Sequence, residues 1–236
     1  MNEATTYDFG DGTGPVLAHQ HSNGGGRVAD SATVSEAVYV GPNAQVFGDA
    51  GVFGDAQVSG SARVSGSAQV SGSARVSGSA RVFGDARVSG DARVFGDAQV
   101  FGDAQVSGSA RVSGDARVFG DARVFGDARV SGDARVFGDA GVSGSAQVSG
   151  SARVSGDAGV SGDARVFGDV YQYLTVTDHG YFVVANWLRE WRIVAGCRDF
   201  TIPEARAHWG DPNYHTPSSG SRIVALLDWL AAQPTP

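Results

Sequence analysis

The stretch "RVFGDARVFGDARVSGDARVFGDA", residues 117–140, repeats one six-residue unit four times. Arg, Val, Gly, Asp and Ala keep their places in each unit, and only the position after Val alternates between Phe and Ser. The same period extends well beyond this stretch, because valine recurs every six residues from Val28 to Val166, 24 times without a slip. A disordered tract has no reason to keep such a period, so the repeat indicates a folded solenoid.

A hexapeptide period with a large aliphatic residue at one position and a small residue two before it predicts a left-handed parallel β-helix. Ala44 before Val46 and Ala122 before Val124 illustrate the pattern. Three hexads form one triangular coil of that fold, so the 24 hexads make about eight coils. Parallel pairing stacks the coils about 4.8 Å apart.

The period also predicts which side chains face inward. Alternation along a strand turns Ala and Val toward the core and Arg and Phe/Ser outward, while Gly with Asp or Ser makes the corner. In a packed core, overpacking and cavities each cost about 1–3 kcal/mol or more. A position that accepts both Phe and Ser is therefore expected on the exterior.

Folding the hexads in threes gathers one group of phenylalanines on a single face. Four of them fall on consecutive coils, where their rings can stack. A contiguous exposed aromatic stripe predicts an interface, and association into a homodimer or homotrimer is the expected outcome. The alternative is that the rings only stabilise the sheet. The expected interface residues are Phe47, Phe83, Phe101, Phe119 and Phe137.

The charges argue against two classes of partner. The net charge is -7, which disfavours general binding to nucleic acid or to anionic membranes. Arg columns beside corner Asp columns are expected to form solvated networks, in which the Asp and Arg of "D-A-R" can pair. Binding of a polyanion along the Arg columns, or of cations along the Asp columns, is a lesser alternative.

The two flanks differ from the repeat, so three regions are expected: a cap at 1–27, the β-helix at 28–169 and a small α+β domain at 170–236. The glycines of 24–26 predict a turn that enters or covers the helix. His19 and His21 form a weak candidate metal pair, and a structural role is preferred to a metal site.

The C-terminal region has elements of its own. "YLTVTDHGYFVVANW" predicts two strands around a turn at 178–180, and "WRIVAGC" predicts another strand. A short helix is expected after Thr201, with Pro203 in its first turn. "GDPNYHTPSSG" predicts a loop, and "SRIVALLDWLAA" predicts an amphipathic helix. This domain is expected to cap the stack, to assist assembly or to hold a protein partner.

The N-terminal sequence lacks the basic region and apolar run of a signal peptide, and no stretch is long enough to span a bilayer. Cys197 is the single cysteine, so no intrachain disulfide is expected. These features favour a cytoplasmic location.

Three motifs, "HQHSNGGGRVADSATV", "VGPNAQVFGDA" and "GCRDFTIPEARAHWG", together with the long "A-R-V-x-G" runs, carry a resemblance. The chain resembles a family of hexapeptide-repeat β-helix proteins from bacteria and their phages. The resemblance implies the fold and a phage-related context, in which a virion-associated location is the alternative to a cytoplasmic one. It transfers no catalytic residue and no activity.

Many left-handed β-helices are acyltransferases, which use a His as general base and often a loop that interrupts the repeat. Here no His occurs between His21 and His179, and no loop breaks the hexads. No catalytic residue, cofactor or metal is therefore expected. The prediction is a non-enzymatic structural or binding rod; sequestration of a small ligand between protomers is the alternative, and ice binding or an acyltransferase-like activity is a lesser one.

Overall fold

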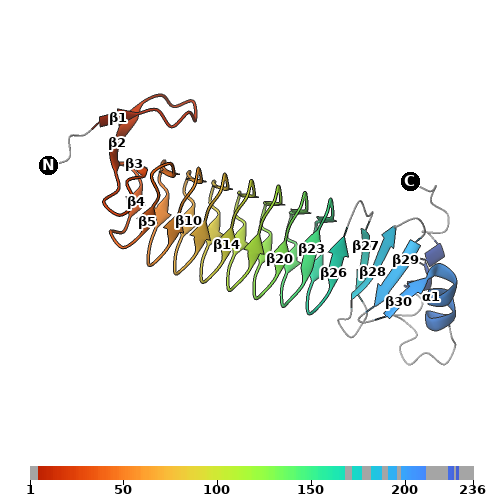
Figure 1. The fold of residues 1–236 in the computed structure, drawn as a ribbon. Helices are drawn as coiled ribbons and strands as arrows, with labels where there is room; N and C mark the ends of the chain where they lie inside the picture. The colour runs from red at the N-terminus through yellow and green to blue at the C-terminus, as the bar shows by residue number, and fades with distance from the viewer. Residues whose placement is uncertain are drawn as a thin grey trace. The chain divides into compact units, whose positions relative to one another are not determined.

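The computed structural model describes residues 5–167, 172–176, 182–187, 191–195, 198–210, 223–225 and 227–228. The chain divides into two compact units, Met1–Val166 and Phe167–Pro236. In the first unit the chain winds through successive coils, and in the second a sheet is accompanied by a helix (Figure 1).

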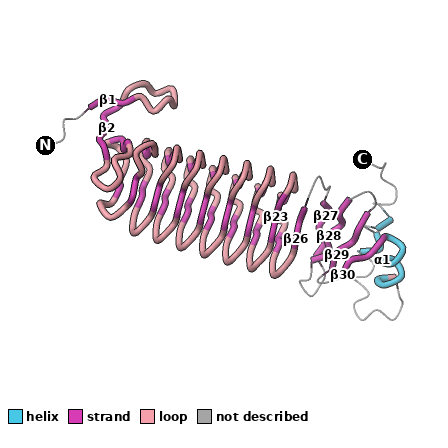
Figure 2. The backbone as a smooth tube through the Cα atoms, viewed as in Figure 1, coloured by secondary structure: helices cyan, strands magenta, loops and turns pink. Residues whose placement is uncertain are grey.

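The first unit is a parallel β-solenoid with three sheets, and each coil adds one strand to each sheet (Figure 2). The first sheet contains β3 (Arg27–Ala29), β6 (Gln45–Val46), β9 (Arg63–Val64), β12 (Arg81–Val82), β15 (Gln99–Val100), β18 (Arg117–Val118), β21 (Arg135–Val136) and β24 (Arg153–Val154). The second contains β4 (Thr33–Val34), β7 (Gly51–Val52), β10 (Gln69–Val70), β13 (Arg87–Val88), β16 (Gln105–Val106), β19 (Arg123–Val124), β22 (Gly141–Val142) and β25 (Gly159–Val160). The third contains β5 (Tyr39–Val40), β8 (Gln57–Val58), β11 (Arg75–Val76), β14 (Arg93–Val94), β17 (Arg111–Val112), β20 (Arg129–Val130), β23 (Gln147–Ser149) and β26 (Arg165–Phe167).

The register confirms that a coil closes after three hexads. Val82 in β12 pairs with Val100 in β15, one coil further along the chain. The N–H of Phe83 donates to the carbonyl of Val100 at 3.0 Å, and the same bond recurs around the solenoid. The predicted parallel solenoid of about eight coils is thus confirmed. Its left-handed winding stays a prediction.

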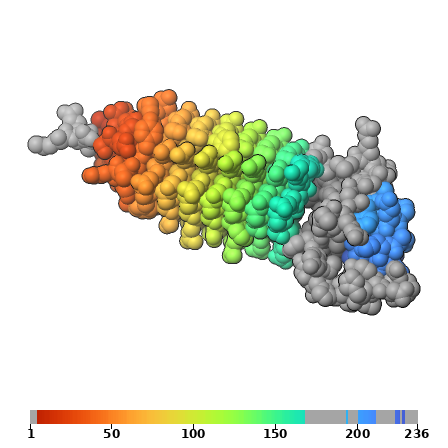
Figure 3. Space-filling view, turned by 60° about the horizontal axis from the view of Figure 1, so that its bottom comes forward, coloured from red at the N-terminus to blue at the C-terminus, as the bar shows by residue number. Residues whose placement is uncertain are grey.

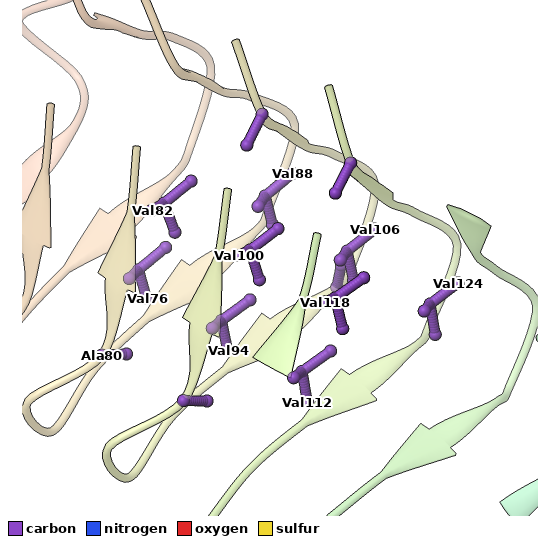
Figure 4. Close-up of a cluster of buried hydrophobic side chains, with 14 of the residues drawn as sticks. Val76, Ala80, Val82, Val88, Val94, Val100, Val106, Val112, Val118 and Val124 are labelled. Atoms are coloured by element: carbon purple, nitrogen blue, oxygen red, sulfur yellow. The ribbon is translucent and has the colours of Figure 1, made fainter. Parts of the chain in front are cut away.

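The core consists almost entirely of valine and alanine. From Val38 to Ala152 these inward side chains are at most 1 % exposed. Valines from the three sheets point into the interior of the coil (Figure 4). Fully burying a valine contributes about 1.5–3 kcal/mol relative to leaving it exposed. The predicted direction of the Ala and Val side chains is confirmed.

The corners require glycine for two separate reasons, which Gly102 illustrates. Its φ is +70°, a region that side chains rarely adopt. A Cβ placed on it would also lie 3.1 Å from the amide nitrogen of Gly120, the corner glycine of the next coil. Glycine therefore lets the chain turn and lets neighbouring coils approach.

The N-terminal segment extends the first sheet, and the turn that follows its second strand is hydrogen-bonded to the first coil. Strands β1 (Thr5–Tyr7) and β2 (Val16–Gln20) pair antiparallel with each other, and β2 pairs antiparallel with β3. After β2 the chain turns at 21–26, where the N–H of Gly26 donates to the carbonyl of Val40 at 2.9 Å. A Cβ on Gly24 would lie 2.3 Å from that same carbonyl oxygen, so the turn packs tightly against the coil.

The second unit has an antiparallel sheet in the order β27 (Gln172–Val176), β28 (Phe182–Trp187), β29 (Trp191–Ala195) and β30 (Arg198–Thr201). The first three strands are those predicted, and the sequence interpretation missed β30. The predicted turn at 178–180, the predicted loop at 210–220 beyond Gly210, and Cys197 lie outside the described residues.

Helix α1 (Ile202–Trp209) begins as predicted. The hydroxyl of Thr201 accepts a hydrogen bond from the N–H of Glu204, whose carboxylate accepts one from the N–H of Thr201. This reciprocal capping box satisfies donors that the first helical turn leaves free. Residues 223–225 and 227–228 of the second predicted helix are helical, with Ile223 buried. Among the described residues, no helix is long and apolar enough to cross a membrane.

Candidate functional site: an aromatic ladder

Four phenylalanines stack on the outer side of the first sheet, each directly after the valine of its strand. We call this set, Phe83, Phe101, Phe119 and Phe137, the aromatic ladder. Neighbouring ring centroids are 4.9, 4.9 and 5.0 Å apart, and their planes are within 3° of parallel. The predicted outward direction and stacking of these rings are confirmed.

The strand register explains the geometry, because parallel in-register pairing repeats each side chain at about the 4.8 Å strand spacing. Each inner ring is covered on both flat sides by its neighbours, so the ladder rings are only partly exposed. Phe125, which has no such neighbour, is 46 % exposed. The ladder thus presents ring edges as one continuous apolar strip.

Phe47 lies in the same column but has a different environment. It is only 6 % exposed, because Phe9 from the N-terminal segment stacks on it with centroids 4.7 Å apart. Tyr7 meets Phe9 edge-on. The Arg63 guanidinium lies 5.0 Å from the Phe47 ring centroid and donates a hydrogen bond to the Phe9 carbonyl. The structure therefore places Phe47 in an internal cluster rather than on the exposed strip with the other four expected interface residues.

Two columns of polar side chains border the ladder. Two residues before each ring is a basic or amide side chain, and two residues after it is a carboxylate. The first column is Arg81, Gln99, Arg117 and Arg135. The second column is Asp85, Asp103, Asp121 and Asp139. All are exposed except Gln99, which is partly exposed. The space-filling view shows outward side chains in repeating rows along the described solenoid (Figure 3).

Within residues 5–167 these charges have no ion-pair partner. Among residues 5–167 the ion pair that the structure gives is His19 with Asp30, and none joins an Asp to an Arg within 4.0 Å. The pairing expected within "D-A-R" is therefore not formed. The aspartate lies in the turn and the arginine in the strand, so the strict alternation that would put them side by side does not hold.

The two N-terminal histidines make local contacts. His19 Nδ1 lies 2.8 Å from a carboxylate oxygen of Asp30, and buried His21 lies with Nδ1 3.3 Å from the N–H and the carbonyl of Asn23. The described residues contain no group of three His, Cys, Asp or Glu side chains that could hold a metal ion.

The sequence interpretation did not anticipate Tyr7 and Phe9. The available signal was the pair of aromatics two residues apart in "YDF", directly before a glycine-rich loop. In the second unit, Phe200, His208 and Trp209 form another ring cluster that was not predicted.

The solenoid is similar to a known repeat family. The family model described as "YdcK Beta solenoid repeat" matches residues 56–72, 68–84, 86–102, 98–114, 110–126, 128–144 and 146–162. All of these matches lie within the parallel solenoid and span the whole ladder. Comparison with curated proteins gave no match, and comparison with solved structures gave none.

Proposed function

We propose that this protein is a non-enzymatic structural solenoid that associates with a second copy of itself through the aromatic ladder. The observation that carries the proposal is the strip of four parallel ring edges, Phe83 to Phe137, which no described residue covers completely. Aromatic residues are enriched in the cores of protein interfaces.

A two-fold dimer uses the same patch on both copies, so four rings per chain give eight in the contact. Fully burying an exposed Phe side chain is worth about 1.5–3 kcal/mol. The ladder rings already cover one another in part, so each contributes a fraction of that value. Their number and alignment make the strip a stronger interface candidate than scattered single residues.

The ladder is not needed to close the coil. Ser89 occupies the equivalent position on the second sheet and donates its N–H to Val106 at 2.9 Å. Phe83 makes the same bond to Val100 at 3.0 Å. Because Ser supports the same backbone, the repeated use of Phe on one face calls for a role beyond folding.

Two sequence features support a non-enzymatic role for the solenoid. No histidine occurs between His21 and His179 to act as a general base, and no inserted loop interrupts the hexads to shape a substrate pocket.

The test is the combined variant Phe83→Ser, Phe101→Ser, Phe119→Ser and Phe137→Ser, examined by native mass spectrometry and sedimentation. We expect the wild-type chain to be dimeric and the ladder variant to be monomeric. The matched control replaces four isolated rings on the other two faces: Phe53→Ser, Phe95→Ser, Phe125→Ser and Phe167→Ser. The control should keep the dimer mass.

Circular dichroism establishes that both variants keep the β-solenoid, since Ser occupies the same position in many other hexads. A wild-type chain that is monomeric at all accessible concentrations would overturn the proposal. A ladder variant that is folded and still dimeric would overturn it as well.

A further inference from the structure

The ladder separates two charge columns of opposite sign. Because its two sides differ in charge, the two possible orientations of a second copy on the ladder are not equivalent. Arg81, Arg117 and Arg135 lie on one side of the rings, and the four aspartates from Asp85 to Asp139 lie on the other. Each charge is two residues from a ring. Next to the rings, a second copy placed on the ladder therefore meets a basic column on one side and an acidic column on the other. Beyond the basic column, four residues before three of the rings, lie the corner aspartates Asp97, Asp115 and Asp133.

Two two-fold arrangements can bring the ladders face to face. In the parallel arrangement the axis runs along the solenoid, and the rotation exchanges the two sides of the strip. Arg81 of one copy then faces Asp85 of the second copy, and Arg117 faces Asp121 in the same way. Gln99 faces Asp103 and can donate a hydrogen bond to it.

In the antiparallel arrangement the axis runs across the solenoid, and the two sides of the strip are not exchanged. With the ladders centred on each other, Arg81 faces Arg135 of the second copy, and Asp103 faces Asp121. Like charges across an interface disfavour the arrangement that juxtaposes them.

The apolar contact is the same in both arrangements, because ring faces ring in each, so the charges select between them. These charges are available, since none of the Arg and Asp side chains of residues 5–167 pair with one another inside the chain. The N-terminal segment covers the same face at Phe47, so the contact is confined to the ladder coils.

We infer that two copies associate in parallel, in register, with the two-fold axis along the solenoid and the Arg column of each copy facing the Asp column of the other. This inference rests on the proposed function and adds the orientation of the partner.

The first test neutralises the basic column with Arg81→Gln, Arg117→Gln and Arg135→Gln, a side chain that position 99 already carries. In the parallel dimer this removes six favourable contacts, so the dissociation constant should rise at least about tenfold at low salt. The matched control replaces three arginines of the third sheet, Arg75→Gln, Arg93→Gln and Arg111→Gln, and should leave the dissociation constant unchanged. Tighter association of the first variant would mean that like charges had been relieved, which contradicts the parallel arrangement.

The second test uses Ser65 and Ser155, which bracket the ladder in its own column. Each is replaced by Cys in a Cys197→Ser background and treated with a short bismaleimide. In the parallel dimer each single variant should cross-link to itself. In the antiparallel dimer Ser65 faces Ser155, the two copies of either residue lie five coils apart, or about 24 Å, and only a mixture of the two variants should cross-link.

The two proposals fail separately. Monomeric mass for the unmodified chain overturns the proposed association itself. A dimer that cross-links only in the mixture overturns the parallel orientation and leaves association through the ladder standing.

Discussion

Phe9 stacks on Phe47 with ring centroids 4.7 Å apart and planes 17° from parallel, close to the spacing within the aromatic ladder. Ala29 occupies the position one coil before Phe47 in the same column, and Phe9, Ala29 and Phe47 belong to one buried cluster. A ring from outside the repeat thus stacks beside a small residue of the column. The outer side of the first sheet therefore already accepts an aromatic ring from another part of the chain, stacked on a phenylalanine of the column.

The first prediction concerns this contact. Phe9→Ala should weaken the attachment of β1 and β2 by about 3 kcal/mol, because Phe9 is 3 % exposed and its loss leaves a cavity against Phe47. Hydrogen exchange of the amides in β1 and β2 measures this local stability. Amides of the central coils should exchange as before, and unchanged exchange in β2 would show that the ring stack does not hold the segment.

A second prediction separates the two roles of corner glycine. Gly102→Ala meets both a φ of +70° and the backbone of the next coil, whereas Gly156→Ala has a φ of +62° with nothing within 4 Å of the added carbon. The conformational strain alone costs about 1–2 kcal/mol. Denaturant unfolding should therefore show a larger loss for Gly102→Ala than for Gly156→Ala. Equal losses would mean that crowding between coils contributes nothing.

Core volume gives a third prediction. Ala98 is fully buried, and Ala98→Val adds two methyl groups where the coil has no room, which should cost about 1–3 kcal/mol in the free energy of unfolding. Gln99→Val places the same side chain on the outer side of the same strand and should cost far less. A thermal or urea midpoint that shifts equally for both would contradict the inward assignment of the alanine column.

The fourth prediction is that removing charge stabilises the third sheet. Arg93 is paired in register with Arg75 on one side and Arg111 on the other, and all are exposed. Like charges directly opposite each other in a sheet are destabilising, so Arg93→Gln should raise the unfolding free energy by about 0.5 kcal/mol at low salt. Added salt should shrink the gain.

The control for this effect is Arg165→Gln. Its strand β26 neighbours β23, which carries Gln147 instead of an arginine. No gain is expected there, and a gain of the same size would point to a cause other than repulsion between neighbouring arginines.

The repeat made much of the solenoid predictable. Every hexad independently predicts the same inward pair, Ala and Val, so the assignment does not depend on any single unit. The register of Val82 with Val100 then follows from closure of the coil after three hexads. The stacking of Phe83 on Phe101 follows from the same register. Helix α1 was predictable because Thr201 and Pro203 mark its start chemically.

Other features depend on contacts that no local pattern encodes. Phe9 reaches Phe47 across 38 positions of sequence, through a glycine-rich segment with no period. Strand β30 is four residues long and runs directly into α1, so its pattern is too short to distinguish from the helix start. The absent pairing of Asp with Arg depends on the direction of a turn, which alternation along a strand does not describe.

The closure of each coil after three hexads governs how such a chain can lengthen. Gain or loss of a whole coil of three hexads shifts every later residue by one coil along the solenoid axis and keeps it in the same column of the same sheet. Gain or loss of a single hexad instead rotates everything downstream by one face, which would break the line of Phe101, Phe119 and Phe137 at that point. Duplications that preserve the surface pattern must therefore add multiples of three hexads, or 18 residues, although the sequence repeat is six residues long.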